Sequence, residues 1–219
     1  LVDGTLAARF DNDSLILESL RFPASLRVIP PEWRTREWIT KEPDAQGGYI
    51  DASGRWNLFE TRGQLAIRVH RFPILQRSDR YAMASGQINV NAELPNIAID
   101  GSLVADAGWI SLEVLRGVPT LDDDVIVRRP GDSTKDATPS IRTTIDLTVD
   151  MGPRFYLTGL GLDAGLLGSI QILLKDDGRL MGIGALRTRD GGIEAYGQRL
   201  RLRRGQVTFQ GRLDNPLLD

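Results

Sequence analysis

Cysteine is absent from this 219-residue sequence, and histidine occurs once, at His70. The first absence excludes disulfides and thiolate metal sites, and the second excludes any metal site that needs two imidazoles. Lys and Arg (27) nearly balance Asp and Glu (29), whereas nucleic-acid-binding proteins usually carry a strong basic excess. No nucleophile–base pair or metal-ligand cluster stands out. The sequence therefore predicts a protein that is not an enzyme, has no cofactor or metal, and binds no nucleic acid.

Long apolar runs are absent as well. No stretch approaches the roughly 18 consecutive apolar residues of a membrane-spanning helix. The first residues, LVDGTLAARF, lack the initiator methionine, the basic region and the apolar core of a signal peptide. The sequence starts within a strand-like pattern and stops abruptly at NPLLD. We therefore expect residues 1–219 to be a fragment of a longer chain.

The sequence does contain a recurring alternation of apolar and polar residues, which predicts β-strands with one apolar face. The clearest run is IRTTIDLTVDM, residues 141–151, in which Ile145, Leu147 and Val149 share one face and Asp146 lies on the other. About a dozen such runs follow one another, and no window of helical period exceeds two turns. The pattern predicts an all-β protein.

Turn-forming residues separate the predicted strands. DNDS, DASG, KDDG and RDGG are typical of hairpins, because Gly, Asn and Asp tolerate positive φ. Glycines within strand-rich sequence, such as Gly168, indicate bulges or bends that curve the sheet. Two segments interrupt the pattern: an irregular crossing at about residues 28–48, which contains Pro30-Pro31, and a polar stretch at about 128–140 that predicts a mobile loop. Strand-like sequence resumes after each, so we predict a single domain over residues 1–219.

An apolar face on every strand has to be covered. A sandwich or small barrel would fill its interior with its own side chains. An outer-membrane barrel would turn the apolar face to lipid tails, and an open, folded sheet would leave an apolar trough for another molecule. Outer-membrane barrels carry aromatic girdles at both interfaces, whereas the 6 Phe, 4 Tyr and 4 Trp here are scattered, which argues against that architecture.

Several segments resemble the C-terminal part of the TamB family, which are translocation and assembly module proteins of Gram-negative bacteria. They are FPILQRSDRYAMASGQ, ADAGWISL, PTLDDDVIV, DMGPRFYLTGLGLDAGLLGSI and, most closely, GIEAYGQRLRLRRGQVTFQGRLDNPLLD. The resemblance covers most of residues 71–219, and residues 1–70 are similar in texture only. It implies a β-taco: an elongated, curved β-sheet folded into a two-walled groove with an apolar interior and little or no helix.

The same resemblance implies a location and partners. Full-length members of the family are periplasmic proteins anchored in the inner membrane of the Gram-negative envelope. They work with the outer-membrane Omp85-type partner TamA, and they are related to AsmA-like and bridge-type lipid transfer proteins. The resemblance implies that the groove shields phospholipid acyl chains and supports phospholipid transport between the membranes and outer-membrane protein assembly. It also implies contact with TamA through the C-terminal region.

We expect the apolar residues of the alternating strands to line this groove. The expected lining residues are Ile88, Val90, Ile97, Ile99, Leu103, Ile145, Leu147, Val149, Phe155, Leu157, Ile170, Ile172, Met181, Ile183, Ile193, Leu200, Leu202, Val207 and Phe209. Small residues such as Gly182 and Gly184 are expected to leave room for a bound chain. The alternative is a chaperone-like scaffold, in which a sheet edge templates strands of client outer-membrane proteins by β-augmentation and the apolar interior is only a core.

Arginines accompany the last alternating run, where Arg199, Arg201, Arg203 and Arg204 surround Leu200 and Leu202. Alternation with leucine favours a solvated outer face for these arginines. Lipid phosphates are the alternative partners.

Overall fold

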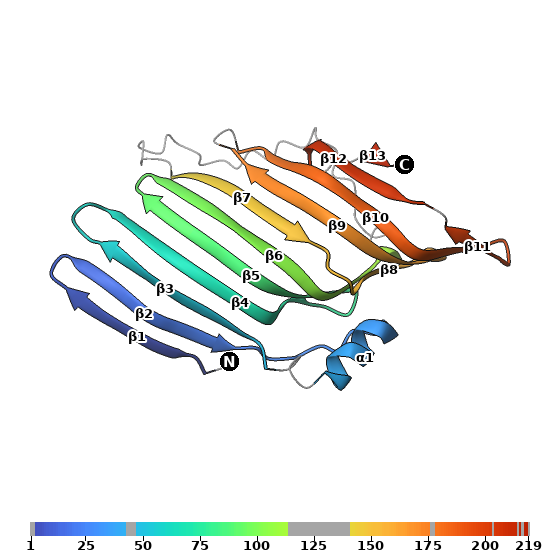
Figure 1. Ribbon diagram of the computed structural model, residues 1–219, viewed down its shortest axis with the longest axis horizontal. Coiled ribbons are helices and arrows are strands. Elements are labelled where there is room, and N and C mark those ends of the chain that lie inside the picture. The colour runs from blue at the N-terminus through green and yellow to red at the C-terminus, as the bar shows by residue number, and fades with distance from the viewer. Residues whose placement is uncertain are drawn as a thin grey trace, which may run out of the picture.

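The computed structural model describes residues 3–42, 47–113, 141–175, 178–202, 204–213, 215 and 217–218. The predicted loop at about 128–140 lies outside these residues. The described chain forms one 13-stranded sheet and one helix, α1 (Trp33–Lys41) (Figure 1). The strands are β1 (Thr5–Asp11), β2 (Ser14–Pro23), β3 (Tyr49–Asn57), β4 (Arg62–Gln76), β5 (Arg80–Glu93), β6 (Asn96–Ser111), β7 (Arg142–Asp150), β8 (Phe155–Gly159), β9 (Leu162–Leu174), β10 (Leu180–Ala195), β11 (Gln198–Leu202), β12 (Gln206–Arg212) and β13 (Leu217–Leu218). The prediction of an all-β, curved sheet with little helix is confirmed.

The strands follow chain order from β1 to β7 and continue with β9, β10, β12 and β13, while β8 pairs with β6 and β9, and β11 with β10. Pairing is antiparallel except at β6, which runs parallel to both β7 and β8. β7 lies beside residues 96–104 of β6, and β8 lies beside residues 108–111. β7 and β8 therefore act as two parts of one interrupted strand.

The pairing register carries one face of the sheet from strand to strand, because directly paired residues lie on the same side. In β5, Ile88 pairs with Ile67 of β4 and with Gly101 of β6. Gly101 in turn pairs with Leu147 of β7, and Leu147 with Ile172 of β9. We call this side the apolar face, and the other side the polar face.

Irregular positions in neighbouring strands line up into a crease across the sheet. In β4 the register shifts beyond Val69, where Arg71 has a φ of 42°, and in β6 Asp106 is an extra residue relative to β5. Ser85 of β5 joins the two positions: its hydroxyl accepts a hydrogen bond from the Arg71 amide (2.9 Å) and donates one to the Asp106 carboxylate (2.6 Å). Extra residues bend a strand, so β4 to β6 bend at the same place.

The crease continues through the break between β7 and β8. Gly152 lies there with a φ of 59°, and a Cβ on it would come within 2.2 Å of the Ala105 carbonyl oxygen in β6. Next to it, the Met151 amide donates a hydrogen bond to the carbonyl of Gly168 in β9 (2.9 Å), and Gly168 has a φ of 119°. The prediction that Gly168 marks a bend in the sheet agrees with this geometry.

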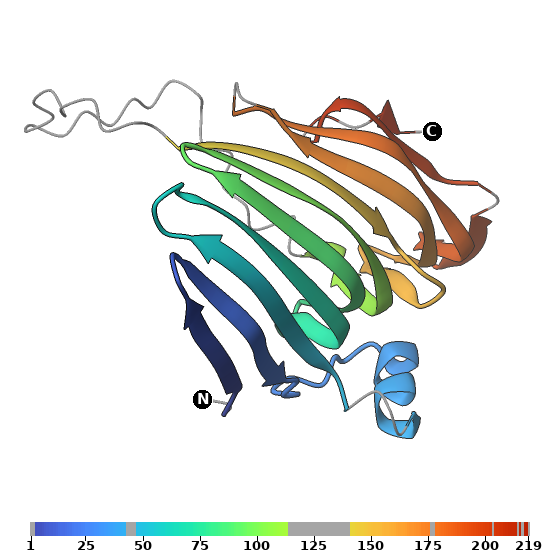
Figure 2. The ribbon, with the colours of Figure 1, turned by 60° about the vertical axis from the view of Figure 1, so that its left-hand side comes forward.

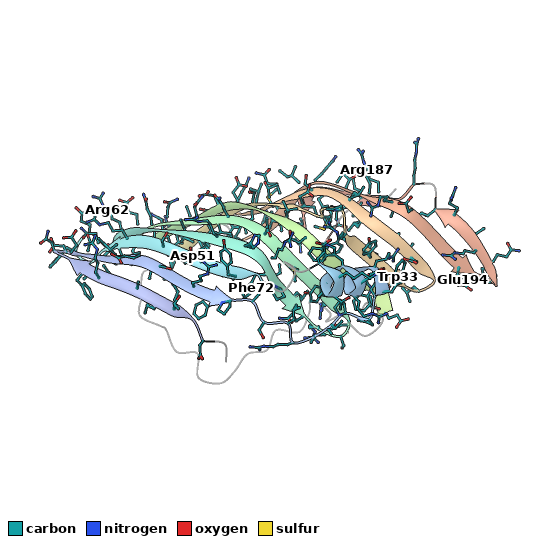
Figure 3. All side chains as sticks on the ribbon, turned by 60° about the horizontal axis from the view of Figure 1, so that its bottom comes forward. Trp33, Asp51, Arg62, Phe72, Arg187 and Glu194 are labelled. Carbon is teal, nitrogen blue, oxygen red and sulfur yellow. The ribbon has the colours of Figure 1, made fainter. Side chains whose placement is uncertain are left out.

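The crease and the strand twist give the sheet its curvature. Figure 2 shows the strands curving in a common sense, and Figure 3 shows the sheet as an arch, with Arg62 and Arg187 above it and Phe72 below. Phe72 pairs with Ala84, on the apolar face, whereas Arg62 and Arg187 belong to the polar face. The apolar face is therefore the concave one.

Helix α1 lies on the opposite side. It begins after Pro30-Pro31, where the Glu32 carboxylate accepts hydrogen bonds from the amides of Arg34 (3.1 Å) and Thr35 (2.7 Å) and caps the first turn. Ile39 packs against Tyr81 and Met83 of β5, which alternate with the apolar-face residues of that strand. The helix thus covers the part of the polar face around Tyr81 and Met83, beyond the crease, and does not cover the apolar face. The predicted irregular crossing at 28–48 contains this nine-residue helix, which is about 2.5 turns long and so exceeds the two turns expected from the sequence.

Two of the predicted turns are not turns. DASG belongs to β3, where a Cβ on Gly54 would meet the Gln64 carbonyl oxygen at 2.2 Å, so this glycine allows close approach of β4. RDGG lies within β10 and forms a bulge, with Asp190 at a φ of 49°. DNDS does connect strands, β1 to β2. KDDG lies between β9 and β10, and its residues 176 and 177 are outside the described part of the chain.

Candidate functional site: the concave apolar face

The apolar face is continuous from β1 to β12. Its members away from the crease carry no charge, and they are Leu6, Ala8 and Phe10 (β1), Leu15, Leu17, Leu20 and Phe22 (β2), Ile50, Ala52, Gly54 and Trp56 (β3), Leu65, Ile67 and Val69 (β4), Ile88, Val90 and Ala92 (β5), Ile97, Ile99 and Leu103 (β6), Ile145, Leu147 and Val149 (β7), Ile170, Ile172 and Leu174 (β9), Gly182, Gly184 and Leu186 (β10), and Val207 and Phe209 (β12). The same face also holds Thr143 and the glycines Gly63 and Gly101. Ten neighbouring strands therefore present one continuous, uncharged and largely apolar surface.

The expected lining residues lie on this face with two exceptions. Those of β5, β6, β7, β9 and β12 belong to the surface just given. Phe155 and Leu157 join it because they pair with Leu166 and Ala164 of β9. The residues of the last hairpin also join it: Ile193 pairs with Leu162 of β9 and Leu200 of β11, and Gly191 pairs with Leu202. Their contact with a ligand stays a prediction.

The exceptions are Met181 and Ile183, and the prediction that they line the groove is wrong in its choice of face. Ile183 pairs with Gln171 and Gln210 on the polar face and is 48% exposed. The apolar-face positions of this part of β10 are Gly182 and Gly184, which have no side chain. The alternation of apolar side chains, taken alone, therefore predicts the wrong face for this part of β10.

One part of the apolar face is open. We call the apolar-face side chains of β1 to β5 the open region. Leu6 and Phe10 at its edge are 68% and 72% exposed. Farther in, Leu65, Ile67 and Val90 are partly exposed, although no polar side chain interrupts them. This surface is available to another molecule.

The other part is filled by the protein itself. Ala105, Phe155, Leu166, Ile170 and Leu186 form a buried cluster, which we call the packed region. Further apolar side chains pack against it: Ile110, Met151, Leu157, Ile172, Val207, Phe209 and Leu213. Phe155 of β8 and Ile170 of β9 lie on opposite sides of the crease. The bend between them brings their side chains into one cluster.

The expectation that Gly182 and Gly184 leave room for a ligand is not met. A Cβ on Gly182 would lie 2.7 Å from the Leu213 side chain and 3.3 Å from that of Phe209. At Gly184, a Cβ would lie 2.3 Å from the Ser169 carbonyl oxygen. Both glycines therefore serve close packing of the protein's own atoms.

Residues of β1 to β4 were not among the expected lining residues, although they form most of the open region. The signal was present, since LAARF (residues 6–10) and LAIRV (65–69) alternate as cleanly as the run at 141–151. Those runs precede residue 71, where the resemblance noted in the sequence begins, and the resemblance selected only later residues.

On the polar face, Arg34 ties α1 to the far part of the sheet. Its guanidinium binds Glu32 (2.6 Å) and Asp163 of β9 (2.5 Å), and its Cζ lies 4.0 Å from the centre of the Tyr156 ring. Burial acts to raise the pKa of Glu32, but hydrogen bonds from Thr35 and Arg34 outweigh it and hold the pKa below its ordinary value. This network is a structural tie, since its groups satisfy one another.

The polar face also has an open hollow of about 990 Å³ near the β3–β4 turn, the β5–β6 turn and the first residues of β7. Its lining is largely polar and includes Arg55, Gln64, Asn91 and Thr144. Within the described ranges, no three His, Cys, Asp or Glu side chains gather in a way that could hold a metal ion, and α1 is too short to cross a membrane. The feature that departs most from an ordinary protein surface is the continuous apolar face.

Comparison with protein families agrees with the resemblance found in the sequence. A family model described as the TamB C-terminal domain matches residues 40–219. The match takes in β3 to β13 and omits β1, β2 and most of α1.

Proposed function

Because the chain belongs to the TamB family, which acts in outer-membrane assembly in the Gram-negative envelope, we propose that its apolar face shields phospholipid acyl chains in transit between the two membranes. The observation that carries this proposal is the uninterrupted apolar face across ten neighbouring strands, open in β1 to β5. Soluble proteins rarely leave so long an apolar surface exposed. An acyl chain matches it in polarity, and each methylene that it buries contributes about 0.8 kcal/mol.

The apolar face runs across the strands, and this direction suits movement of a lipid along the sheet as well as its binding. Strands lie about 4.8 Å apart, so the open region from β1 to β5 offers a path of roughly 20 Å. Neighbouring strands offer similar aliphatic side chains, for example Ile67 of β4 beside Ile88 of β5. Similar neighbours give an acyl chain similar affinity at each strand, so no single position becomes a deep trap.

Site-specific crosslinking tests the proposal. A photo-reactive amino acid replaces Ile67 or Val90 on the apolar face, and Arg68 or Asn91, the next residues along the same strands, serve as controls on the polar face. The purified variants are incubated with radiolabelled phospholipid and illuminated. We expect label at positions 67 and 90 only. Equal labelling of both faces, or labelling of neither, contradicts the proposal.

The scaffold function is the second candidate, and the edge strand β1 favours it. β1 pairs with β2 alone, so one row of its backbone amides and carbonyls has no neighbouring strand among the described residues. An incoming strand could pair there while covering Leu6 and Phe10. A photo-reactive residue at Ala7 that captures an unfolded outer-membrane protein, together with no lipid at position 67, would favour this function.

The cellular setting is part of the proposal. We place the chain in the periplasm, within a longer protein anchored in the inner membrane, with no catalytic role. The outer-membrane partner TamA would bind near β12, whose outer neighbour in the described chain, β13, pairs at Val207 and Thr208. Hydrogen exchange tests this contact: amides of residues 209–212 should exchange more slowly when the periplasmic domains of TamA are added, and unchanged exchange would contradict it.

A further inference from the structure

The hairpin formed by the end of β10 and by β11 is a margin of the sheet, where β10 still pairs with β9 at Gly192 and Ile193. Residues 191–195 pair with residues 198–202, and Tyr196 and Gly197 form the two-residue turn with φ values of 53° and 73°. Within the described chain, β11 has β10 as its only neighbouring strand. The hairpin lies at the end of the sheet opposite β1, and Figure 3 shows Glu194 at that extremity (Figures 1 and 3).

The hairpin is amphipathic, and its apolar side is exposed. Leu200 shares the apolar face with Ile193 and is 55% exposed, whereas Arg199 and Arg201 alternate with it on the polar face. At the tip, the Tyr196 side chain is fully exposed, with a relative exposure of 105%. An apolar side chain and an aromatic ring therefore stand in water beside two cations.

Positive charge is concentrated in the same place. Residues 187–204 hold six arginines and two carboxylates, a net charge of +4 in a chain whose net charge is -2. Arg199, Arg201 and Arg204 are exposed, and none of them forms an ion pair within the described part of the chain. The hairpin therefore presents unneutralised positive charge.

We propose that this hairpin docks on the surface of an anionic phospholipid bilayer. Tyr196 and Leu200 enter the interfacial layer, where amphipathic aromatic rings are favoured, and Arg199 and Arg201 meet lipid phosphates. A merely solvated face accounts for the arginines but not for the exposed Tyr196 and Leu200. Pairing with a strand of another polypeptide would explain the open edge of β11, but it would not explain the positive charge. Docking requires no acyl chain on the concave face, so it can fail or succeed independently of the proposed function.

The turn between β3 and β4 provides a matched control. Its tip also exposes apolar side chains, with Leu58 at 50% and Phe59 at 79%. Its arginines are paired, however: Arg62 binds Glu60 at 2.6 Å, and Arg55 lies 3.5 Å from Asp11. The two tips thus share exposure and differ in free positive charge.

The absence of native cysteine allows a direct test with a single label. An environment-sensitive dye is attached to Tyr196→Cys or, as control, to Phe59→Cys. Each is titrated with vesicles of phosphatidylcholine alone and with vesicles that also contain phosphatidylglycerol. We expect a blue shift at position 196 with the anionic vesicles only, and none at position 59. No shift at 196, or an equal shift at 59, overturns the proposal; the first result would leave β11 as an edge for a polypeptide.

Charge variants test the role of the arginines. The double variant Arg199→Gln/Arg201→Gln should weaken binding to anionic vesicles about 25-fold at low salt, since each arginine near such a surface contributes about 5-fold. Arg55→Gln/Arg62→Gln removes the same charge from the control tip and should change binding less than about 2-fold. Wild-type binding should fall as salt rises. Equal effects of the two double variants, or binding that salt does not change, contradict docking through this hairpin.

Discussion

The open region and the packed region are made of the same kind of strand but treat their apolar side chains differently. Phe10 in the open region is 72% exposed, whereas Phe155 in the packed region is 7% exposed. The difference lies in what faces each strand. At the packed region the crease sets β8 against the neighbouring strands, so that Phe155 and Ile170 share one cluster. At β1 and β2 no second layer of described residues covers Phe10.

This difference separates stability from binding. Full burial of a large apolar side chain contributes about 1.5–3 kcal/mol, and several such side chains gather in the packed region. Much of the fold's stability therefore resides there. The open region leaves apolar surface exposed to water, and burial of that surface by a ligand would contribute free energy to binding. One continuous face thus supports folding at one end and is free for recognition at the other.

The largest expected effect comes from placing a carboxylate in each region. Ile170→Asp puts an unpaired charge into the packed region and should destabilise the fold by about 3–5 kcal/mol. Ile67→Asp puts the same charge on the open region, where water reaches it, and should destabilise by about 1 kcal/mol. Urea unfolding followed by circular dichroism measures both. Equal losses would mean that the open region is a closed core.

The crease offers the second test, because it creates the packed region. Gly152→Ala combines a positive φ with a Cβ 2.2 Å from the Ala105 carbonyl oxygen, and should destabilise by at least about 2 kcal/mol. Gly178→Ala is the matched control, since Gly178 has a φ of 74° and no atom within 4 Å of its Cβ position. Its effect should be about 1 kcal/mol. If thermal unfolding shows equal shifts for the two variants, the close approach at Gly152 is not what shapes the crease.

Much of this fold could be predicted because apolar and polar residues alternate in the sequence wherever the apolar-face positions carry side chains. The run at 141–151 predicted the faces of Leu147 and Asp146 correctly. The crease could not be predicted, since it depends on the alignment of Arg71, Asp106 and Gly152 across strands, which only the register fixes. The distinction between the open and packed regions follows from the crease, so it could not be predicted from the sequence either.

The third test concerns α1, which joins the two regions. The helix belongs to the connection between β2 and β3, and its Arg34 binds Asp163 of β9. Glu32→Gln should destabilise the fold by about 1–2 kcal/mol at pH 7, because the cap and the ion pair to Arg34 weaken. The exposed Glu37→Gln, which loses only its pair with Lys41, should change stability by about 0.3–0.5 kcal/mol.

The pH dependence has a definite sign. The pKa of Glu32 is lowered in the folded state, so its stabilisation is fully present above the ordinary value of 4.5 and is lost as pH falls through the lower, folded-state pKa. The difference in unfolding temperature between wild type and Glu32→Gln should therefore shrink below pH 4.5. If the difference stays constant down to acid pH, the ionised form of Glu32 does not contribute to the connection between the two regions.

The smallest expected effect tests the register of β10, where sequence alternation selected the wrong face. Ile183 is 48% exposed between Gln171 and Gln210, so Ile183→Asp should change the free energy of unfolding by only about 0.5 kcal/mol. Leu186, three residues along the same strand, is 8% exposed within the packed region, and Leu186→Asp should destabilise by several kcal/mol, about as much as Ile170→Asp. Chemical denaturation of the two variants compares the faces of one strand directly. If Ile183→Asp is as damaging as Leu186→Asp, then Ile183 is buried after all, and Gly182 and Gly184 do not belong to the apolar face.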